Sequence, residues 1–254
     1  MKDWKGNKDA TRSRLAIKKD HTTKGRQDKD FYATDPRAIE LLLDHCSCFL
    51  RTLLASCHRR PHEVLGGTYT KPAYGFIHRW TYKIEGEKVP VVNMYKPNIW
   101  EPAAGVGNLA KVLNGRGFDC FPSDIIDRGG YEPKKLMEID FLKSDQSFMR
   151  KHNFGVILTN PPYRYATEFA EHALKILPKN GCYIAFMSLN YLAGQKRYNR
   201  LYQYGELREV YVFSKRVECW RNNDREKYGG KAMADYAWYV FQKGYAGNPT
   251  IYWI

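Results

Sequence analysis

Four consecutive residues, Asn160-Pro161-Pro162-Tyr163, have the types and the order needed to hold a planar amine. They follow the apolar run 155–159, which is typical of a buried parallel strand, and the prolines end that strand because they donate no N–H. The Asn160 side-chain oxygen and the Pro161 carbonyl can accept the two amine hydrogens, and Tyr163 can stack on the attached ring. A rigid turn after a strand is the other interpretation.

A second motif, Glu101 followed by Gly105-x-Gly107-x-x-Ala110, indicates a tight turn between a strand and a helix. Glycine permits positive φ and a close approach of the backbone to a ligand. The spacing also satisfies the dinucleotide pattern G-x-G-x-x-G/A, so a nicotinamide enzyme is one interpretation of this turn taken alone. A structural turn that binds nothing is another.

Two acidic residues end later strands in the predicted order. Asp124 ends the second strand, where a carboxylate can accept hydrogen bonds from ribose hydroxyls. Asp140-Phe141 comes at the next strand end, where the pair could contact the amino group and the ring of an adenine. Helix capping by the Asp and core packing by the Phe are the structural alternatives.

Strands and helices alternate after residue 98, which predicts an α/β fold with a Rossmann-like, doubly wound, seven-stranded and mostly parallel sheet. The predicted strands are 98–101, 118–123, 136–139, 156–159, 181–188, 209–213 and 236–242, with a short terminal strand at 250–254 and helices at 108–115 and 165–177. Before the sheet, Pro36 opens a helix that Thr34 or Asp35 caps and that an apolar stripe extends to about Ser56. Alternating residues predict a β-hairpin insertion within 61–98.

Composition favours a globular chain with a polyanionic partner. The 254 residues are 43% hydrophobic and carry a net charge of +14, a balance that favours nucleic acid over membrane. No secretory leader or membrane-length apolar run is found, so we expect reduced thiols and the cytoplasm of a bacterium or phage-infected cell. Residues 1–30 carry ten Lys or Arg against five Asp, which predicts a basic, disordered arm.

A zinc site is one hypothesis for the cluster His45, Cys46, Cys48, Cys57, His58 and His62. Its spacing fits no standard zinc finger, and most of it falls within the predicted helix. Positions on a helix are the favoured explanation, and no metal is predicted.

The order of the motifs along successive strand ends is more specific than any one of them. Phe31-Tyr32-Ala33-Thr34, the run Glu101 to Gly107, Asp124-Ile125, Asp140-Phe141 and Asn160-Pro161-Pro162-Tyr163 together resemble the S-adenosylmethionine-dependent amino-methyltransferases. With the glycine turn well before the Asn-Pro-Pro-Tyr motif, the order is similar to that of the gamma group of DNA N6-adenine methyltransferases. The segments 212–216 and 237–245 look like those of small methyltransferases from phages and mobile elements. The resemblance covers residues 31–45 and 98–254.

The resemblance implies a methyltransferase domain over residues 31–254, S-adenosyl-L-methionine as the cofactor and DNA as the partner, with RNA the lesser candidate. No membrane and no obligate protein partner are expected. The implied cofactor-binding residues are Tyr32, Ala33, Thr34, Glu101, Pro102, Ala103, Gly105, Gly107, Asp124, Ile125, Asp140, Phe141 and Asn160. The implied catalytic residues are Asn160, Pro161, Pro162 and Tyr163, which would hold and stack on a flipped adenine.

Residues 191–231 combine ten Lys or Arg with six Tyr, a pattern that suits contacts with phosphates and bases. The candidate nucleic-acid-binding residues are Lys196, Arg197, Arg200, Lys215, Arg216 and Arg221. Segment 216–232 is predicted to be a loop on the substrate side, within which residues 222–230 form a mobile loop that could close over the substrate. An ordinary solvated surface is the alternative for each of these residues.

Other substrates and one other class of protein remain open. A methyltransferase with the same tetrapeptide could act on a protein glutamine or on guanine N2 in RNA. A protein of this fold could also bind nucleic acid without catalysis. Gamma enzymes usually carry a large target-recognition domain after the core, whereas here only 61–98 and 216–232 are additional. This difference leaves the sequence specificity, and the choice of DNA over RNA, open. Because no nuclease-like region is found, we expect a stand-alone methyltransferase without a fused nuclease.

Overall fold

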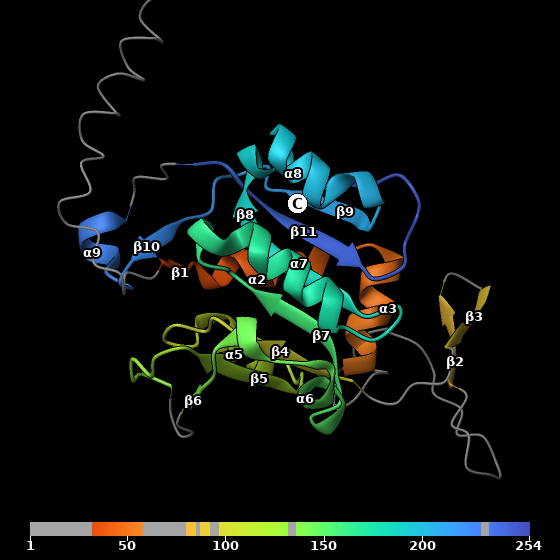
Figure 1. Ribbon diagram of the computed structural model, residues 1–254, viewed down its shortest axis with the longest axis horizontal. Coiled ribbons are helices and arrows are strands. Elements are labelled where there is room, and N and C mark those ends of the chain that lie inside the picture. The colour runs from red at the N-terminus through yellow and green to blue at the C-terminus, as the bar shows by residue number, and fades with distance from the viewer. Residues whose placement is uncertain (1–31, 58–79, 85–86, 92–96, 132–135, 230–233) are drawn as a thin grey trace, which may run out of the picture. The chain divides into compact units, whose positions relative to one another are not determined.

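Residues 32–57, 80–84, 87–91, 97–131, 136–229 and 234–254 are described by a computed structural model of the chain (Figure 1). The helices are α2 (Pro36–His45), α3 (Cys48–Cys57), α5 (Asn108–Gly115), α6 (Gln146–Lys151), α7 (Ala166–Ile176), α8 (Gln195–Arg200) and α9 (Arg225–Tyr228), with 3-10 turns η1 (Phe141–Lys143), η2 (Tyr163–Tyr165), η3 (Leu189–Leu192) and η4 (Tyr202–Tyr204). The strands are β1 (Tyr32–Thr34), β2 (Trp80–Ile84), β3 (Glu87–Val91), β4 (Asn98–Glu101), β5 (Cys120–Asp124), β6 (Met137–Glu138), β7 (Phe154–Thr159), β8 (Cys182–Ser188), β9 (Leu207–Val212), β10 (Cys219–Arg221), β11 (Tyr236–Gln242) and β12 (Thr250–Trp253).

Eight strands form one sheet in the order β12-β9-β11-β8-β7-β4-β5-β6. β4 pairs in parallel with β5 on one side and with β7 on the other, and the chain adds strands outward in both directions. β11 lies between β8 and β9 and is antiparallel to both. The predicted α/β fold with a doubly wound, mostly parallel sheet is therefore confirmed, and β12 adds an eighth strand parallel to β9.

The two faces of the sheet carry separate buried clusters. One cluster joins α2, α3 and α5 to alternate strand residues such as Val156 and Leu158. The other joins α6 and α7 to the intervening strand residues, among them Trp100 and Ile157. Figure 1 shows α2 and α7 on opposite sides of the sheet. Because both faces are covered, the central strands β7 and β8 are nearly continuous apolar runs.

The helix predicted from Pro36 to about Ser56 is two helices, because the backbone is extended at Cys46. The Ser47 hydroxyl accepts a hydrogen bond from the Leu50 N–H at 3.1 Å, as an N-cap residue does. The same hydroxyl donates to the carboxylate of the buried Glu209 at 2.8 Å. The continuous apolar stripe predicted one helix. The helix is instead interrupted at Ser47, whose hydroxyl supplies the hydrogen-bond donor that the buried Glu209 carboxylate needs.

Two short antiparallel ribbons lie outside the eight-stranded sheet. β1 pairs with β10, so that Ala33 lies opposite Trp220. β10 and α9 lie within the segment 216–232, which was predicted to be a loop on the substrate side. β2 pairs with β3 within the predicted insertion 61–98, with Trp80 opposite Val91.

Several predictions fall on residues that the structure does not describe. The basic arm 1–30 lies outside the described residues, as do His58 and His62 of the cysteine–histidine cluster. Cys46 and Cys57 of that cluster are buried with α2 and α3 in the core. Within the described ranges, no group of three His, Cys, Asp or Glu residues is placed to hold a metal ion. None of the described helices has the length and apolar character needed to cross a membrane.

Phe141 begins η1 and is a core residue, with 2% of its surface exposed. Its ring packs edge-on against Trp100 at 5.2 Å and contacts Phe169 at 4.7 Å, both measured between ring centroids. The ring is therefore not presented to a ligand in this structure. The packing alternative for this residue describes its side chain better than the predicted adenine contact does.

We expect Phe141→Ala to lower the free energy of unfolding by about 3–5 kcal/mol, since it empties a buried aromatic site. Leu142→Ala is the matched control: its side chain is 37% exposed, and its effect should stay within about 0.5 kcal/mol. Urea denaturation followed by tryptophan fluorescence measures both. Equal, small losses for the two variants would contradict the core assignment.

Candidate active site

Three polar residues end neighbouring parallel strands. Glu101 ends β4, Asp124 ends β5 and Asn160 comes directly after β7. Strands are added in opposite directions from β4 and from β7, and in doubly wound sheets ligands bind outside the carboxyl ends of the strands at this reversal. The fold thus brings the glycine turn and the Asn-Pro-Pro-Tyr motif to the same end of the sheet.

The glycine turn has the conformation that its residues predicted. Gly105 and Gly107 have φ values of 59° and 79°, which favour glycine. The Gly105 N–H donates to Asp124 Oδ2 at 2.8 Å, which ties the turn to the end of β5. Gly107 is the residue from which α5 starts.

Tyr131 lies against the glycine turn and was not singled out in the sequence. A Cβ atom at Gly107 would come within 2.2 Å of Cδ2 of the Tyr131 ring, so the turn has no room for a side chain. The Tyr131 hydroxyl accepts a hydrogen bond from Asn114 Nδ2 at 3.0 Å, which holds the ring against α5. In this structure the group that approaches the Gly107 backbone closely is the Tyr131 ring.

Both carboxyl groups beside the glycine turn are buried. Glu101 is 2% exposed, and its Oε2 accepts a hydrogen bond from the Ala110 N–H at 2.9 Å. Burial raises the pKa of Glu101 well above its usual range, and the nearby Asp124 raises it further. Burial also raises the pKa of Asp124, against the lowering effect of hydrogen bonds from Gly105 and Ile126. Such a pair favours a ligand that brings positive charge or hydrogen-bond donors.

The Asn160 side chain is fixed by β1. Its Nδ2 donates to the Tyr32 carbonyl at 3.0 Å and to Thr34 Oγ1 at 2.9 Å, and lies 3.8 Å from Cys219 Sγ. Because the nitrogen faces these acceptors, the oxygen must point the other way. Oδ1 is buried and has no hydrogen-bond partner among the described residues, and a buried acceptor in that state costs about 1–3 kcal/mol.

Tyr163 presents part of its ring to solvent and turns its hydroxyl inward. The ring is 39% exposed and stacks on Tyr32 with centroids 5.9 Å apart and an interplanar angle of 24°. The hydroxyl lies 3.6 Å from Cys219 Sγ, and the ring of Tyr236 is 6.3 Å away. Burial of this cluster raises the pKa of the Cys219 thiol to about 11. Cys219 and Tyr236 were not predicted, since neither belongs to a local motif.

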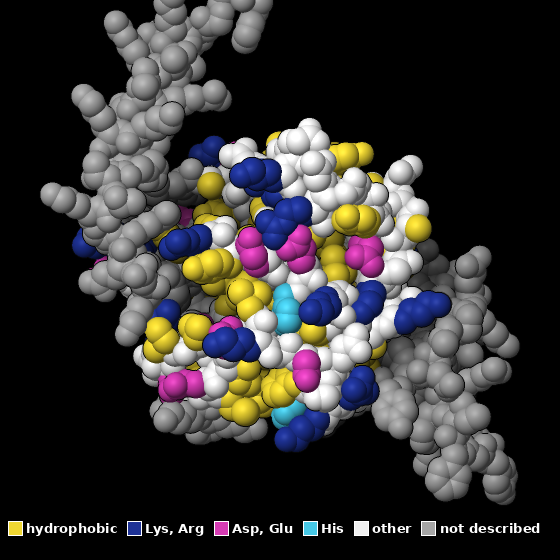
Figure 2. Space-filling view, viewed as in Figure 1, with side chains coloured by type: hydrophobic (Ala, Val, Ile, Leu, Met, Phe, Trp, Pro, Cys, Tyr) yellow, Lys and Arg dark blue, Asp and Glu magenta, His cyan; other side chains and the backbone are white. Residues whose placement is uncertain are grey.

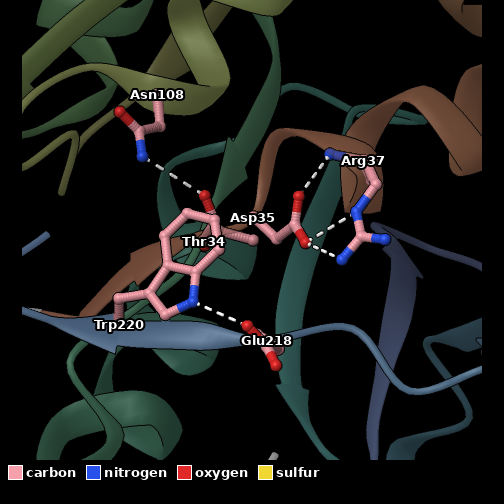
Figure 3. A network of polar contacts seen from close by, with 6 residues as sticks. All are labelled: Thr34, Asp35, Arg37, Asn108, Glu218 and Trp220. Carbon is pink, nitrogen blue, oxygen red and sulfur yellow. Dashed lines mark hydrogen bonds and ion pairs between the residues drawn. The ribbon is translucent and has the colours of Figure 1, made fainter. Parts of the chain in front are cut away.

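Polar contacts join the β1–β10 ribbon to the glycine turn (Figure 3). Asn108, the first residue of α5, donates to the Thr34 carbonyl at 3.3 Å. Asp35 is buried, caps α2 and pairs with Arg37. Trp220 Nε1 donates to the Glu218 carboxylate at 2.8 Å on the β10 side. The Asn108 contact thus reaches Thr34, whose hydroxyl accepts a hydrogen bond from the Asn160 amide.

The other predicted site residues are placed unequally. Ile125 is 61% exposed beside Asp124, as a residue available to an apolar ligand surface would be. Asp140 caps η1 through the Leu142 N–H and pairs with Lys143 at 3.2 Å, which is the capping alternative. The remaining residues are the buried Ala33, Pro102 and Pro161, the half-buried Ala103 and the exposed Pro162.

Three of the predicted nucleic-acid contacts are engaged within the protein. Arg197 donates to backbone carbonyls of η3, Arg200 pairs with two glutamates of α7, and Arg216 donates to Asp235 at 2.8 Å. Figure 2 shows acidic side chains among basic ones over α7 and α8, so this face carries no uniform positive field. The other three candidates are the exposed Lys196 and Lys215 and the half-buried Arg221 of β10.

No family model and no curated protein matches the chain. Solved structures with a similar fold include the type IIG restriction endonuclease BpuSI, at 15% identity and a TM-score of 0.43, over 59% of this chain and 23% of that one. A predicted O-methyltransferase from Agrobacterium tumefaciens is 14% identical with a TM-score of 0.43, over 64% of this chain and 81% of that one.

A third similar structure is a protein from Listeria monocytogenes assigned to the class I S-adenosylmethionine-dependent methyltransferases. It is 11% identical with a TM-score of 0.40, over 62% of this chain and 58% of that one. The chain thus spans less than a quarter of the restriction endonuclease. At these identities the likeness concerns the fold, and it identifies neither a substrate nor a reaction.

Glu101→Gln should raise stability at neutral and alkaline pH. The folded protein holds the Glu101 proton more tightly than the unfolded chain does, so wild-type stability falls as pH rises from about 4.5 through the raised pKa. Glutamine resembles the protonated acid and removes this loss. Thermal unfolding between pH 5 and pH 9 should show a flatter profile for Glu101→Gln than for the exposed control Glu138→Gln; identical profiles would contradict the burial of a titrating Glu101.

Proposed function

We propose that this protein transfers a methyl group from S-adenosyl-L-methionine to the exocyclic N6 of adenine in DNA. One observation carries the proposal: Asn160 Oδ1 is a buried acceptor without a partner, at the carboxyl end of a central strand, while Nδ2 of the same amide is tied to β1. An N–H donor brought to this atom relieves the cost of burying it unpaired.

An exocyclic amine is the substrate group that fits this chemistry. Its lone pair is delocalised into the ring, which makes it a poor nucleophile. Acceptors at Asn160 Oδ1 and the Pro161 carbonyl would take its two hydrogens, favour a pyramidal nitrogen and direct the lone pair to the methyl carbon. The same acceptors stabilise the positive charge that develops on the nitrogen. Methyl transfer then depends mainly on alignment, and no strong base is needed beforehand.

The residues beside the glycine turn fit S-adenosylmethionine. This cofactor supplies an activated methyl group on a sulfonium, and it carries an amino-acid end, a ribose and an adenine. The buried Glu101 would border the amino-acid end, beside the turn that Gly105 and Gly107 form. Asp124 would hold the ribose hydroxyls, and the exposed Ile125 would lie against the adenine. Tyr32, Ala33 and Thr34 would enclose the methionine end, next to Asn160.

A base in a duplex must leave the stack to reach Asn160, at a cost of a few kcal/mol. Stacking on Tyr163 would offset about 1–3 kcal/mol of this cost. The exposed part of the Tyr163 ring supports this role, and its present stacking on Tyr32 indicates a ring that already accepts a planar neighbour. The net charge of +14 supports nucleic acid over a protein glutamine as the acceptor.

The test uses labelled cofactor with DNA, RNA and protein acceptors, followed by digestion to nucleosides. We expect N6-methyladenine from DNA, and a loss of about 100- to 1,000-fold in kcat for Asn160→Ala, as for the removal of one preorganised catalytic group. The control is Asn248→Ala, at an exposed position away from the motifs. Label found only in RNA or protein would refute the DNA substrate, and an active Asn160→Ala protein would refute the site. A protein without cofactor affinity would belong to the non-catalytic class.

Thr34 is a positioning residue for the Asn160 amide, because its hydroxyl is one of the two oxygen acceptors for Nδ2. Thr34→Val keeps the shape and removes this bond, so we expect kcat to fall about threefold to tenfold, the value of one hydrogen bond. The KM for DNA should stay unchanged, and Thr34→Ser should restore kcat. Steady-state kinetics with cofactor calorimetry distinguishes this role: a Thr34→Val protein that loses only cofactor affinity would contradict it.

A further inference from the structure

A hollow of about 330 Å³ opens beside Tyr163. It is lined by the first turn of α7, the carboxyl end of β8 and residues of η3. In strand order β8 follows β7 on the side opposite to β4, and neither Asn160 nor the glycine turn lines the hollow. Tyr163 is therefore the residue that the hollow shares with the acceptor site.

The lining combines apolar surface with fixed polar groups. Met187 and Tyr191 are buried, at 1% and 8% exposure, and Ser188 and Thr167 contribute hydroxyls. The Arg197 guanidinium lies over the Tyr191 ring, 5.0 Å from its centroid, and Nε donates to the Tyr191 carbonyl at 2.8 Å. The cation is thus held over an aromatic ring, and a guanidinium is a group on which a planar ligand can stack.

A phosphate group fits this lining poorly. The Glu168 carboxylate belongs to it and repels an anion. Arg197 uses its donors on backbone carbonyls of η3. Arg200 binds Glu168 Oε1 at 3.3 Å, which holds the carboxylate in place as a hydrogen-bond acceptor. The hollow therefore suits an uncharged ring that carries an amino group.

We propose that this hollow takes the nucleobase next to the target adenine in the same strand, with Glu168 accepting a hydrogen bond from its exocyclic amino group. The proposal rests on the proposed function, because a target ring stacked on Tyr163 leaves its neighbour at the edge of the hollow. Carboxylates accept from cytosine N4, whereas thymine has a carbonyl at that position. Tyr165 and Tyr198 adjoin the lining residues in the chain and are 44% and 54% exposed, so further bases have rings to stack on.

The test compares short DNA single strands with one adenine and with cytosine or thymine at each neighbouring position. Glu168→Gln is compared with Glu171→Gln, a matched control because Glu171 also pairs with Arg200 but does not line the hollow. We expect kcat/KM to favour cytosine about tenfold at one neighbour in the wild type and in Glu171→Gln. The preference should disappear in Glu168→Gln, because the amide can donate to thymine O4 as well as accept from cytosine N4. Fluorescence anisotropy with the same labelled strands measures the preference in binding, without catalysis.

The two readouts separate the two proposals. Methylation that ignores the neighbouring base, or a cytosine preference that survives Glu168→Gln, would overturn the assignment of the hollow and leave the proposed function standing. A Glu168-dependent preference for cytosine in binding to strands that are never methylated would support the assignment of the hollow and overturn the proposed function. Strands that are neither bound nor methylated would overturn both.

Discussion

The amide of Asn160 is held by a strand that does not belong to the central sheet. Two acceptors of β1 take its nitrogen, and its oxygen is left buried and unpaired. β1 in turn depends on its pairing with β10 and on the Asn108 contact from the glycine turn. Buried polar groups need partners, so this network is complete on one side of the amide and incomplete on the other. The incomplete side is where a ligand gains most by binding.

Local signals predicted the sheet well and the elements beside it poorly. The bounds of β4, α5 and β11 match the predicted ranges, because apolar runs, glycines and prolines mark them within a few residues. The break between α2 and α3 depends on Glu209, more than 160 positions along the chain from Ser47. β10 is three residues long and is defined by its partner β1. Neither feature leaves a local pattern.

The residues of the candidate site likewise fall into those that a local motif predicted and those that no local motif marks. Asn160, Gly107 and Tyr163 were predicted from motifs whose residue types are constrained by their own backbone. Cys219, Tyr236 and Tyr131 line the same region and carry no motif, since they arrive from other elements. For Phe141, the position in a motif predicted a ligand contact, whereas in this structure the ring packs in the aromatic cluster around Trp100.

The pairing of β1 with β10 also sets the order in which the site is completed. Strand pairing between distant segments requires the closure of a long loop, which is entropically costly and slow. During synthesis from the N-terminus, Tyr32 and Thr34 are made long before their pairing partners Arg221 and Cys219. A growing chain that already contains the glycine turn and Asn160 therefore lacks the ribbon that aims the amide. Only after residues 219–221 have been made can the paired ribbon present its two β1 acceptors to the Asn160 amide.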